Sequence, residues 1–398
     1  MTHDRGTRKA HILVVTRNLP PLTGGMERLG QHLVGALAEQ YAVDVVGPPG
    51  AAPYLPAAVR VCSCRSAAAA AFLLEAAWHA PRCALRRRPA LVLATSGLTA
   101  PLARTAALLA RAPYLVCVHG LDLVTRHPLY RGLFLPAIRR ADCVVANSHN
   151  SARLAGAVGV APGRLRVVHP GVDTDVPAVD AAGFRRRHGL DGARVLLAVG
   201  RYAARKGLPE FIERALPALV AADPRYVLVV IGDTARQSVR REGGVHDRIE
   251  AAIERTGLAS HVRLLGALPD AELAAAYSGA DVHVFPVIPV AGDVEGFGMV
   301  AVEAAAHGLW TVAFDEGGVA DAVIEGESGA LVPSGDYAAL VATIRAAIDS
   351  ALPRRAAGCR RVAAGFAWPR YTAEMLATVA ATMRPPAAAS DEGNEHAR

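Results

Sequence analysis

Lysine is almost absent from this chain of 398 residues: it occurs only as Lys9 and Lys206, although the formal net charge is +7. Arginine therefore carries nearly all the positive charge, and each of the two lysines stands out. Aromatic residues make up only 5% of the sequence, and no basic segment interleaved with aromatic residues indicates nucleic-acid binding. We therefore expect no nucleic-acid partner.

The six cysteines form no CxxC pair of the kind that holds zinc or exchanges disulfides. Cys117 and Cys143 lie inside apolar, strand-like runs, and we interpret all six as reduced thiols of a cytoplasmic protein. Long hydrophobic runs are also lacking, because the Ala-rich stretch from Ser66 to Ala80 is interrupted by Glu75 and flanked by arginine. The charged start of the chain has no signal-peptide pattern, so we expect a soluble or peripheral protein.

The positive charge is unevenly distributed. Residues 1–180 contain 20 Lys and Arg against 10 Asp and Glu, whereas residues 181–398 contain 23 against 26. This asymmetry predicts an anionic partner for the first half, either a phosphorylated acceptor or lipid head groups. The segment Arg126–Arg140 mixes four arginines with apolar residues, as an interfacial helix would, or it is an ordinary helix with a solvated arginine face. Peripheral contact with an anionic membrane is therefore an expectation.

The length and the 52% hydrophobic content predict two domains. Short apolar runs alternate with segments of helical length, which is typical of βαβ units and a buried parallel sheet, and therefore of an α/β fold. The pattern restarts after a polar hinge near Pro170–Pro177. The expected strands are His11–Thr16, Val43–Val46, Ala90–Ala94, Tyr114–Val118, Cys143–Ala146 and Leu165–His169, then Arg194–Val199, Val227–Ile231, Val262–Leu265, Val282–Phe285 and Thr311–Phe314.

We accordingly predict an N-terminal domain over residues 1–173 and a second domain over residues 174–366. A last helix at residues 367–384 carries Trp368, Tyr371, Met375 and Leu376 at spacings compatible with one face. Residues 385–398 are small, polar and preceded by proline, and we predict a disordered tail.

Two turns in the first half place candidate ligand-binding residues after predicted strands. Gly24 and Gly25 precede a helix expected from about Met26, so backbone amides there could approach a phosphate or sugar, or the turn is plain architecture. The pattern is not GxGxxG, which disfavours NAD. His119 follows another strand, at the sheet edge where α/β folds bind ligands, although a lone histidine there is more often structural.

The second half opens with a similar turn that carries one of the two lysines. Residues 200–207 read GRYAARKG, with Gly200 at the end of a strand. The cationic heads of Arg201 and Lys206 flank this turn and could converge on a diphosphate. The alternative is a solvated basic turn.

The strongest signal is EGFGMVAVEA at residues 295–304. Glu295 lies in a glycine-rich loop, and Glu303 lies two turns into the helix that Gly298 is expected to start. The helix N-terminus offers free amides to an anionic or hydroxylated ligand. Glu303 stands among apolar residues and needs a partner, which a ribose diol would provide, while Glu295 could bind hexose hydroxyls. Two further glycine turns, at residues 315–318 and 326–333, are explained as well by architecture alone.

These motifs, in this order, resemble the family 4 retaining glycosyltransferases over about residues 11–380. The specific part is GRYAARKG, EGFGMVAVEA and FDEGGVADAVIEGESGALVPSGD. The resemblance implies the GT-B architecture, in which two Rossmann-like domains face each other across a cleft and a C-terminal helix crosses back to the N-terminal domain. Trp310 departs from the family pattern, which commonly has proline before this strand.

The resemblance also implies roles for single residues. Arg201 and Lys206 would neutralise the donor diphosphate, His119 would contact sugar and phosphate, and Gly25 would let the first domain close over the diphosphate. The predicted catalytic residues are His119, Arg201, Lys206 and Glu295, and the predicted donor-binding residues are Gly24, Gly25, Gly200, Gly296, Phe297, Gly298, Met299, Val300 and Glu303. No metal and no cofactor are implied, since the nucleotide sugar is a substrate.

Retention in this family is explained by front-face attack, in which the departing phosphate oxygen takes the acceptor proton. This agrees with the residues, since the motifs contain no convincing pair of nucleophile and base. Catalysis would then consist mostly of positioning and charge stabilisation.

The piece GDVEGFG at residues 292–298 is similar to bacterial phosphatidylinositol mannosyltransferases and related cell-envelope enzymes. It implies a GDP-mannose or UDP-sugar donor, and a sugar, lipid-linked or small-molecule acceptor in envelope glycolipid, polysaccharide or secondary-metabolite biosynthesis. Two alternatives stay open: a sugar epimerase of the same fold, and a nucleotide-sugar-binding protein without turnover. An epimerase needs catalytic carboxylates that the motifs do not place. Turnover in the presence of an acceptor would distinguish a transferase from a binding protein.

Overall fold

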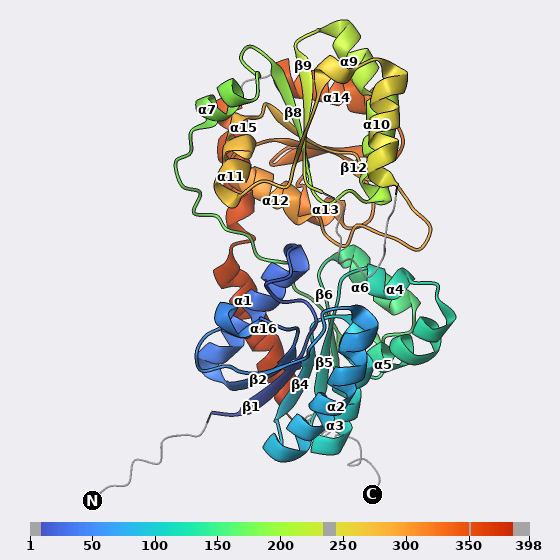
Figure 1. The fold of residues 1–398 in the computed structure, drawn as a ribbon, viewed down its shortest axis with the longest axis vertical. Coiled ribbons are helices and arrows are strands. Elements are labelled where there is room, and N and C mark those ends of the chain that lie inside the picture. The colour runs from blue at the N-terminus through green and yellow to red at the C-terminus, as the bar shows by residue number, and fades with distance from the viewer. Residues whose placement is uncertain (1–8, 234–243, 350–351, 385–398) are drawn as a thin grey trace, which may run out of the picture.

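The computed structural model describes residues 9–233, 244–349 and 352–384. Two parallel sheets, each with helices on both faces, lie one above the other in Figure 1, and the chain passes from the lower to the upper at about residue 170. The predicted tail at residues 385–398 and the first eight residues lie outside the described part.

The first sheet has seven parallel strands in the order β3-β2-β1-β4-β5-β6-β7. Apolar and β-branched runs such as HILVV in β1 form its buried centre, because parallel strands covered on both faces must be apolar on both sides. The order reverses between β1 and β4. The strands are β1 His11–Val15, β2 Ala42–Gly47, β3 Arg60–Ser63, β4 Leu91–Ala94, β5 Tyr114–Val118, β6 Cys143–Ala146 and β7 Leu165–Val167.

Helices rich in alanine, leucine and arginine connect these strands and cover both faces of the sheet (Figure 1). Helix α1 begins at Gly25, directly after Gly24, and α6 begins after Ser148, whose hydroxyl accepts the Ser151 N–H as an N-cap. The helices are α1 Gly25–Gln40, α2 Ala69–Arg87, α3 Ala100–Ala110, α4 Leu121–Val124, a π-helical turn at Tyr130–Phe134, α5 Leu135–Arg139 and α6 His149–Ala157.

The second sheet has six parallel strands in the order β10-β9-β8-β11-β12-β13. Its order reverses between β8 and β11, which are neighbours although a long stretch of chain separates them. Open α/β sheets bind ligands at such a reversal, outside the carboxyl ends of the strands. The strands are β8 Arg194–Val199, β9 Tyr226–Ile231, β10 Val262–Gly266, β11 Val282–Phe285, β12 Thr311–Asp315 and β13 Gly329–Pro333.

The helices of the second half are shorter on average, and one of them, α12, starts at Met299 after a left-handed Gly298 (φ 98°). Only a residue without a side chain adopts this conformation at no cost, and a Cβ there would lie 2.9 Å from the Phe285 ring. The helices are α7 Ala181–Arg187, α8 Leu208–Arg214, α9 Leu216–Ala222, α10 Val245–Thr256, α11 Asp270–Gly279, α12 Met299–Ala306, α13 Val319–Ala322, α14 Tyr337–Asp349 and α15 Leu352–Ala364.

The last helix, α16 (Trp368–Met383), returns to the first sheet and lies beside α1 (Figure 1). Trp368, Tyr371, Met375 and Leu376, which the sequence places on one face, are all buried against the core of the first sheet. The chain passes between the two sheets twice. The two crossings lie side by side, since the Val172 N–H of the first donates to the Phe366 carbonyl of the second at 2.8 Å.

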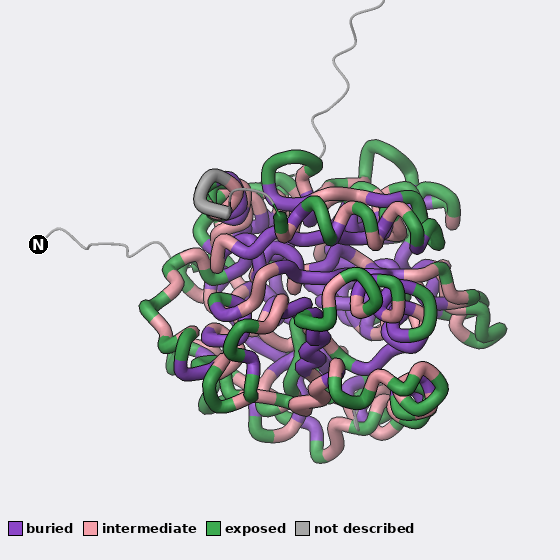
Figure 2. The backbone as a smooth tube through the Cα atoms, turned by 90° about the horizontal axis from the view of Figure 1, so that it is seen from above, coloured by how far each residue is buried: buried purple, intermediate pink, exposed green. Residues whose placement is uncertain are grey.

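Four apolar clusters, two for each sheet, form the core of the described residues. Along β8 the side chains alternate between two of them: Leu196 and Ala198 belong to one, Val195 and Leu197 to the other. Figure 2 shows the buried residues running through the middle of the molecule and the exposed ones on the outer turns. The two-domain α/β prediction and the GT-B architecture are confirmed.

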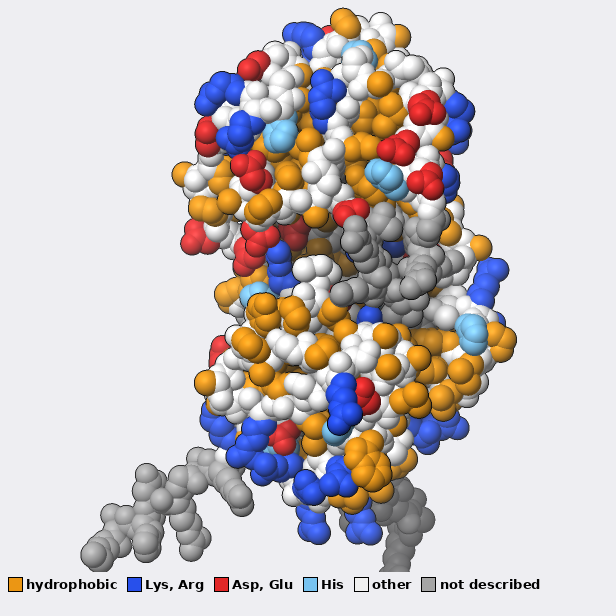
Figure 3. All heavy atoms as spheres, in the orientation of Figure 1, with side chains coloured by type: hydrophobic (Ala, Val, Ile, Leu, Met, Phe, Trp, Pro, Cys, Tyr) orange, Lys and Arg blue, Asp and Glu red, His pale blue; other side chains and the backbone are white. Residues whose placement is uncertain are grey.

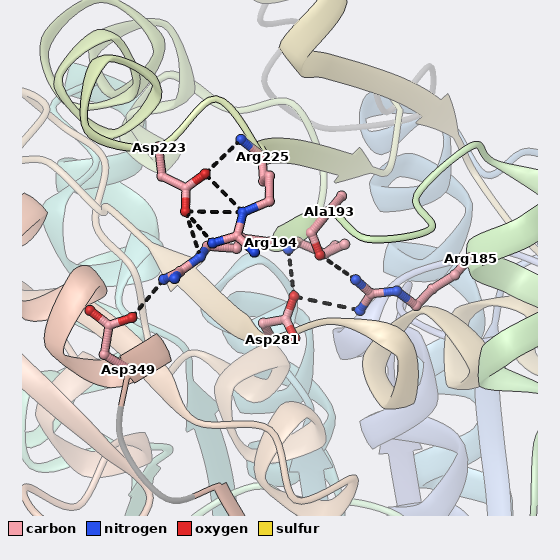
Figure 4. Close-up of polar contacts among 8 residues, drawn as sticks. Arg185, Ala193, Arg194, Asp223, Arg225, Asp281 and Asp349 are labelled. Carbon is pink, nitrogen blue, oxygen red and sulfur yellow. Dashed lines mark hydrogen bonds and ion pairs between the residues drawn. The ribbon is translucent and has the colours of Figure 1, made fainter.

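A network of ion pairs closes the amino-terminal edge of the second sheet (Figure 4). Arg194 bonds Asp223 at 2.9 Å and Asp349 at 2.7 Å, so it ties the start of β8 to the end of α14. Asp281 accepts the Val195 N–H at 2.6 Å and pairs with Arg185. Because a ligand of this fold binds at the opposite, carboxyl edge, the network stabilises the fold.

Several details differ from the sequence-based expectations. Strand β3 was not predicted, because Arg60–Ser63 is a half-exposed edge strand without a continuous apolar run. The segment 126–140 is not one helix: it contains the π-helical turn and the short α5, with Leu129 and Leu133 exposed. All six cysteines are free, as predicted. Within the described ranges, no helix has the length and apolar character needed to cross a membrane.

Candidate active site

The first wall of the cleft is formed by the carboxyl edge of the first sheet. β1 leads into Gly24 and Gly25, which are exposed at the N-terminus of α1, and β5 leads into His119. Gly24 has φ 150°, and a Cβ there would lie 2.5 Å from a Glu27 carboxylate oxygen. Asn18 donates to the other oxygen of Glu27 at 2.8 Å, which fixes the first turn of α1. The free amides of that turn therefore face the cleft.

His119 is oriented by hydrogen bonds at both ends. Its Nε2 lies 2.8 Å from the Thr95 carbonyl oxygen, and because a carbonyl only accepts, Nε2 carries the proton. In the neutral ring Nδ1 is then an acceptor. The His119 backbone N–H donates to Asp122 at 3.1 Å, and the Tyr130 hydroxyl lies 3.3 Å from the other oxygen of Asp122. The imidazole is thus held in one tautomer.

The second wall contains a buried pair of opposite charges. Lys206 Nζ lies 2.9 Å from Glu295 Oε2, and both side chains are about nine-tenths buried. The two meet because β8, which leads to Lys206, and β11, which leads to Glu295, are neighbours at the reversal of strand order. Lys206 also lies 4.5 Å from the centre of the Phe285 ring, a cation–π contact.

Arg205 completes this charged group. Its Nε donates to Glu295 Oε2 at 3.0 Å and its terminal nitrogen pairs with Asp293 at 3.2 Å. Burial raises the pKa of Glu295, but the charges and hydrogen bonds of Lys206 and Arg205 outweigh burial and lower it to about 2. Burial lowers the pKa of Lys206; the charge of Glu295 opposes that shift, and the charges of Arg205 and Arg201 add to it.

The sequence motif indicated Arg201 and Lys206, whereas the structure gives the contacts to Arg205 and Lys206. Arg201 is exposed, close enough for its charge to act on Lys206, and no hydrogen bond or ion pair joins it to the described residues. Arg205 was missed because three cationic residues in one short turn look alike in sequence. Gly200 (φ 136°) lets the turn fold back, since a Cβ there would lie 3.4 Å from the Lys206 side chain.

The loop from Glu295 to Gly298 leads into α12, whose first residue, Met299, lies next to Gly25 at the start of α1. The Ala301 N–H bonds the Gly298 carbonyl, while the earlier amides of Met299 and Val300 have no partner within the helix. Phe297 is buried beneath the loop. A Cβ on Gly25 would lie 3.1 Å from Met299 Sδ, so the N-termini of α1 and α12 face each other across the cleft.

Glu303 faces the same cleft one turn further along α12. Its Oε2 accepts the Tyr277 hydroxyl at 3.1 Å, and burial raises its pKa although Arg28 opposes that shift. Arg28 belongs to α1 and reaches across to Glu303 at 3.9 Å and Asp270 at 3.6 Å. One carboxylate oxygen of Glu303 is therefore free of short hydrogen bonds and accessible to a hydroxyl ligand.

Backbone contacts hold the two walls together at the centre. A Cβ on Gly296 would lie 2.4 Å from the His119 carbonyl oxygen, and one on Gly120 would lie 2.9 Å from Val294. Both glycines are thus required by close approach. His119 of one wall and the Glu295 loop of the other therefore meet.

The arrangement suits an anionic ligand with hydroxyl groups. Two helix N-termini and the ammonium of Lys206 attract a diphosphate, while Glu303 and the His119 ring offer acceptors for hydroxyls. Glu295 and Glu303 lie on a loop and a helix with different partners, and neither forms a pair of nucleophile and base with a neighbour.

Comparison with known proteins agrees with this geometry. The family profile described as Glycosyl transferases group 1 matches residues 181–360, and the profile described as Glycosyltransferase Family 4 matches residues 23–176. Together these matches cover more than half of the chain. The chain therefore belongs to the family 4 glycosyltransferases, and it is an enzyme that transfers a hexose from a nucleotide sugar.

Curated relatives are similar along much of the chain. One is the GDP-mannose-dependent alpha-(1-6)-phosphatidylinositol monomannoside mannosyltransferase of Mycolicibacterium smegmatis, 31% identical over 87% of this chain and 91% of the relative. Another is a D-inositol 3-phosphate glycosyltransferase of Catenulispora acidiphila, 35% identical over 69% of this chain and 68% of the relative. A similar enzyme of Geodermatophilus obscurus is 36% identical, but the match covers only 55% of its length.

Solved structures share the fold at lower identity. The Anabaena protein HepE in complex with UDP-glucose superposes with a TM-score of 0.75 at 19% identity, covering 93% of this chain and 99% of that one. Sucrose-phosphate synthase from Thermosynechococcus elongatus superposes with a TM-score of 0.77 at 22% identity, covering 94% and 99%. These likenesses establish the arrangement of the two domains.

Proposed function

We propose that the chain is a retaining hexosyltransferase whose donor is a nucleoside diphosphate hexose, GDP-mannose or a UDP-sugar, and whose acceptor is a hydroxyl group. Lys206 and the α12 N-terminus bind the diphosphate, with Arg201 as a second cation. Glu303 binds the ribose, and Glu295 with the amides of Phe297 and Gly298 binds the hexose hydroxyls. Retained configuration, metal independence and these residue roles belong to the proposal.

The observation that carries the proposal is the buried Lys206–Glu295 pair at 2.9 Å, where the strand order of the second sheet reverses between β8 and β11. An ammonium has three donors, and Glu295 occupies one of them, so Lys206 keeps donors for phosphate oxygens. Because burial lowers the local dielectric constant, charge that develops on the departing diphosphate is stabilised more strongly here than in water.

Catalysis then consists of positioning and charge stabilisation. His119, held by Thr95 and Asp122, places its Nδ1 beside the sugar, and the departing phosphate oxygen accepts the proton of the attacking hydroxyl. The bond from the anomeric carbon to the phosphate oxygen breaks, and the bond to the acceptor oxygen forms on the same face. No protein nucleophile takes part.

The relatives support an acceptor of polyol or lipid-linked type in envelope glycolipid or polysaccharide biosynthesis in the cytoplasm. One is named for phosphatidylinositol monomannoside and another for inositol 3-phosphate, so an anionic polyol is common to both names. The HepE structures, in contrast, contain UDP and glucose. The donor base therefore stays open between guanine and uracil.

The experiment that tests the proposal is a screen without added metal. Purified protein is mixed with GDP-mannose, UDP-glucose or UDP-N-acetylglucosamine, and thermal stabilisation and release of the nucleoside diphosphate are measured with and without D-inositol 3-phosphate. We expect one donor to stabilise the fold and to be turned over. Binding without release in any condition would assign the chain to a nucleotide-sugar-binding protein, and conversion to an epimeric sugar nucleotide would assign it to an epimerase.

We further propose that the first domain contacts an anionic membrane through the outer face of α2. Leu74, Trp78 and Leu85 are 77%, 63% and 56% exposed, and their spacing places them on one stripe of the helix. Arg82 lies 4.9 Å above the Trp78 ring, and three further exposed arginines end the helix. Figure 3 shows arginines gathered at this end of the first domain, away from the cleft. Apolar and cationic side chains together suit lipid head groups.

Vesicle co-sedimentation tests this contact. We expect binding to phosphatidylglycerol vesicles, weaker binding to phosphatidylcholine vesicles, and a loss of several-fold in the variant Trp78→Ser. The matched control is Tyr54→Ser, since Tyr54 is 47% exposed on another part of the same domain. Equal binding of wild type and Trp78→Ser would contradict the proposed face.

A further inference from the structure

Two histidines of the first domain contact one carboxylate of the second domain. The contact lies outside the charged group that Lys206, Arg205 and Glu295 form. Asp321, on α13, accepts the His149 N–H at 3.0 Å and contacts the His149 ring through Nδ1. His169 Nε2 lies 3.3 Å from the same oxygen, Oδ1. The Asp321 side chain is only 11% exposed, so these contacts replace water around a largely buried charge.

The carboxylate also meets the N-terminus of a helix. His149 is the first residue of α6, and the Asp321 oxygen that accepts its N–H lies where the helix dipole favours negative charge. Burial raises the pKa of Asp321, but the hydrogen bonds and charges of His169 and His149 outweigh burial and lower it. The Asp321 carboxylate is therefore ionised where both histidines contact it.

Asp321 is connected, through the turn that precedes α13, to the loop from Glu295 to Gly298, which we call the donor loop. The Gly318 N–H, at the start of this turn, donates to the Glu295 carbonyl at 2.8 Å. A Cβ on Gly318 would lie 2.2 Å from the Gly296 carbonyl oxygen, so the turn and the loop are in direct backbone contact. A shift of Asp321 relative to the first domain therefore shifts the loop that carries Glu295.

His169 is connected to the hinge and to the same loop. It directly precedes Pro170, where the first passage between the domains begins, and its ring lies 5.6 Å from the Phe366 ring on the returning passage. Its other face stacks on Phe297 of the donor loop at 5.4 Å. One imidazole thus touches both crossings of the hinge, the donor loop and the carboxylate of α13.

We infer that His149, His169 and Asp321 form a clasp that sets the angle between the domains and thereby places the donor loop against His119. The three residues are positioning residues, because no hydrogen bond, ion pair or ring contact among the described residues joins them to His119, Lys206, Glu295 or Glu303. The clasp deepens the proposed function and rests on it, since its effect on turnover requires a donor that is turned over. The angle between the domains is a property of the chain itself and is measurable without a donor.

The test compares Asp321→Ala, Asp321→Asn and Asp321→Glu with the control Asp191→Ala, an exposed carboxylate in a turn of the same domain. Affinity for the free nucleoside diphosphate is measured by calorimetry, and kcat and KM are measured by release of diphosphate from the donor. We expect Asp321→Ala to lower kcat at least tenfold while nucleotide affinity changes less than twofold. Asp321→Asn should be intermediate and Asp321→Glu should recover much of the rate.

Small-angle scattering of the unliganded proteins separates the clasp from the chemistry. We expect a larger radius of gyration for Asp321→Ala than for wild type and for Asp191→Ala, at equal thermal stability of the folded domains. Identical scattering of Asp321→Ala and wild type would overturn the inference, whether or not a donor is turned over. A loss of rate that a chelator reproduces in wild type would assign the three donors to a metal ion instead, and would also overturn the clasp.

Discussion

The two walls of the cleft hold their side chains in different ways. The second-domain wall is built from buried ion pairs, with Lys206 and Arg205 on Glu295. The first-domain wall holds His119 by hydrogen bonds instead, from its ring to the Thr95 carbonyl and from its backbone N–H to Asp122, and Thr95 donates to Thr16. We call it the neutral wall because no ion pair joins the His119 ring or these hydroxyl groups to the described residues. A fixed charged wall suits the diphosphate of a nucleoside diphosphate sugar such as GDP-mannose or UDP-glucose. A neutral wall suits hydroxyl groups, whose positions vary with the acceptor.

The same contrast separates the two glutamates of the second wall. Glu295 has two cationic partners and a pKa lowered to about 2, so it stays ionised. Glu303 has the Tyr277 hydroxyl and a distant Arg28, and burial raises its pKa. Eight residues of one loop and helix thus place two carboxylates in opposite electrostatic surroundings. Glu295 is therefore held in place by its two cationic partners, whereas Glu303 keeps one oxygen free of short hydrogen bonds.

The largest expected effect comes from removing the ammonium of the charged wall. Lys206→Ala leaves Glu295 paired with Arg205, so the fold should persist, but the developing charge on the diphosphate loses its nearest cation. We expect kcat to fall by about 10²–10³, as for the loss of one preorganised donor to a transition state. Release of diphosphate at saturating donor measures the effect.

The chain provides its own control, because it contains one other lysine. Lys9 is exposed and donates to the Glu39 carbonyl at the end of α1, at 2.8 Å. Lys9→Ala should leave kcat within twofold of wild type. A similar loss in both variants would mean that the charged wall has no special role.

A smaller effect is expected on the neutral wall. His119→Ala should lower kcat about a hundredfold, the lower range for a positioned group that acts in the transition state. Nucleotide affinity should change little, because the nucleotide is held by the other wall. The control is His127→Ala, because His127 is an exposed histidine of the same domain. An unchanged kcat in His119→Ala would mean that His119 has a structural role only.

Arg205 fixes the donor loop through its ion pairs with Asp293 and Glu295. Arg205→Ala should raise the KM for donor about tenfold, since the loop loses its anchor, and should destabilise the fold by about 3 kcal/mol because two buried carboxylates lose a partner. Denaturant unfolding and initial rates measure both. The control is Arg187→Ala, whose half-exposed pair with Glu272 should contribute less than about 1 kcal/mol.

The smallest effect is on stability and involves the core beneath the charged wall. His283 is fully buried, its Nδ1 bonds Thr311 at 3.1 Å, and burial together with the charge of Lys206 lowers its pKa from 6.5 to about 3. The unfolded chain therefore binds a proton below pH 6.5 that the folded chain does not. Stability from this group is complete above pH 6.5 and is lost as the pH falls toward 3.

Thermal unfolding between pH 6.5 and 4.5 measures this loss, because the stability that Glu295 contributes through its lowered pKa is constant above pH 4.5 and is lost only below that window. We expect up to about 1.4 kcal/mol per pH unit from one such histidine. His283→Asn should flatten the dependence, and the exposed His127→Asn should not. Equal slopes in the three proteins would contradict the assignment.

Most of the fold was predictable from the sequence, because apolar runs of strand length are buried on both faces of parallel sheets. Strands such as β5 and β11 end within one residue of the predicted bounds. β3 was not predictable in this way, since an edge strand needs only one buried face. The predicted helix over residues 126–140 is interrupted by a π-helical turn, which the pattern of apolar and basic residues does not indicate.

The candidate site was predictable where a motif places a residue in a turn or loop that follows a strand, as for His119, Lys206 and Glu295, or on the helix that such a loop begins, as for Glu303. It was not predictable where contacts depend on the second domain's approach to the first. Asp321 and His169 are 152 residues apart in sequence, and nothing in their local patterns indicates that they meet. The choice between Arg201 and Arg205 depends on the turn of the chain after β8, which the composition of the turn does not specify.

The most direct test of the central claim is the anomeric configuration of the first product. Wild-type protein is incubated in chelator with the donor that stabilises it, and proton NMR follows the sugar and the released nucleoside diphosphate before mutarotation. We expect release of the nucleoside diphosphate, with the anomeric configuration of the donor retained in the product. Inverted configuration, or no release in chelator but release with a divalent metal, would contradict a charged wall that acts alone through front-face transfer.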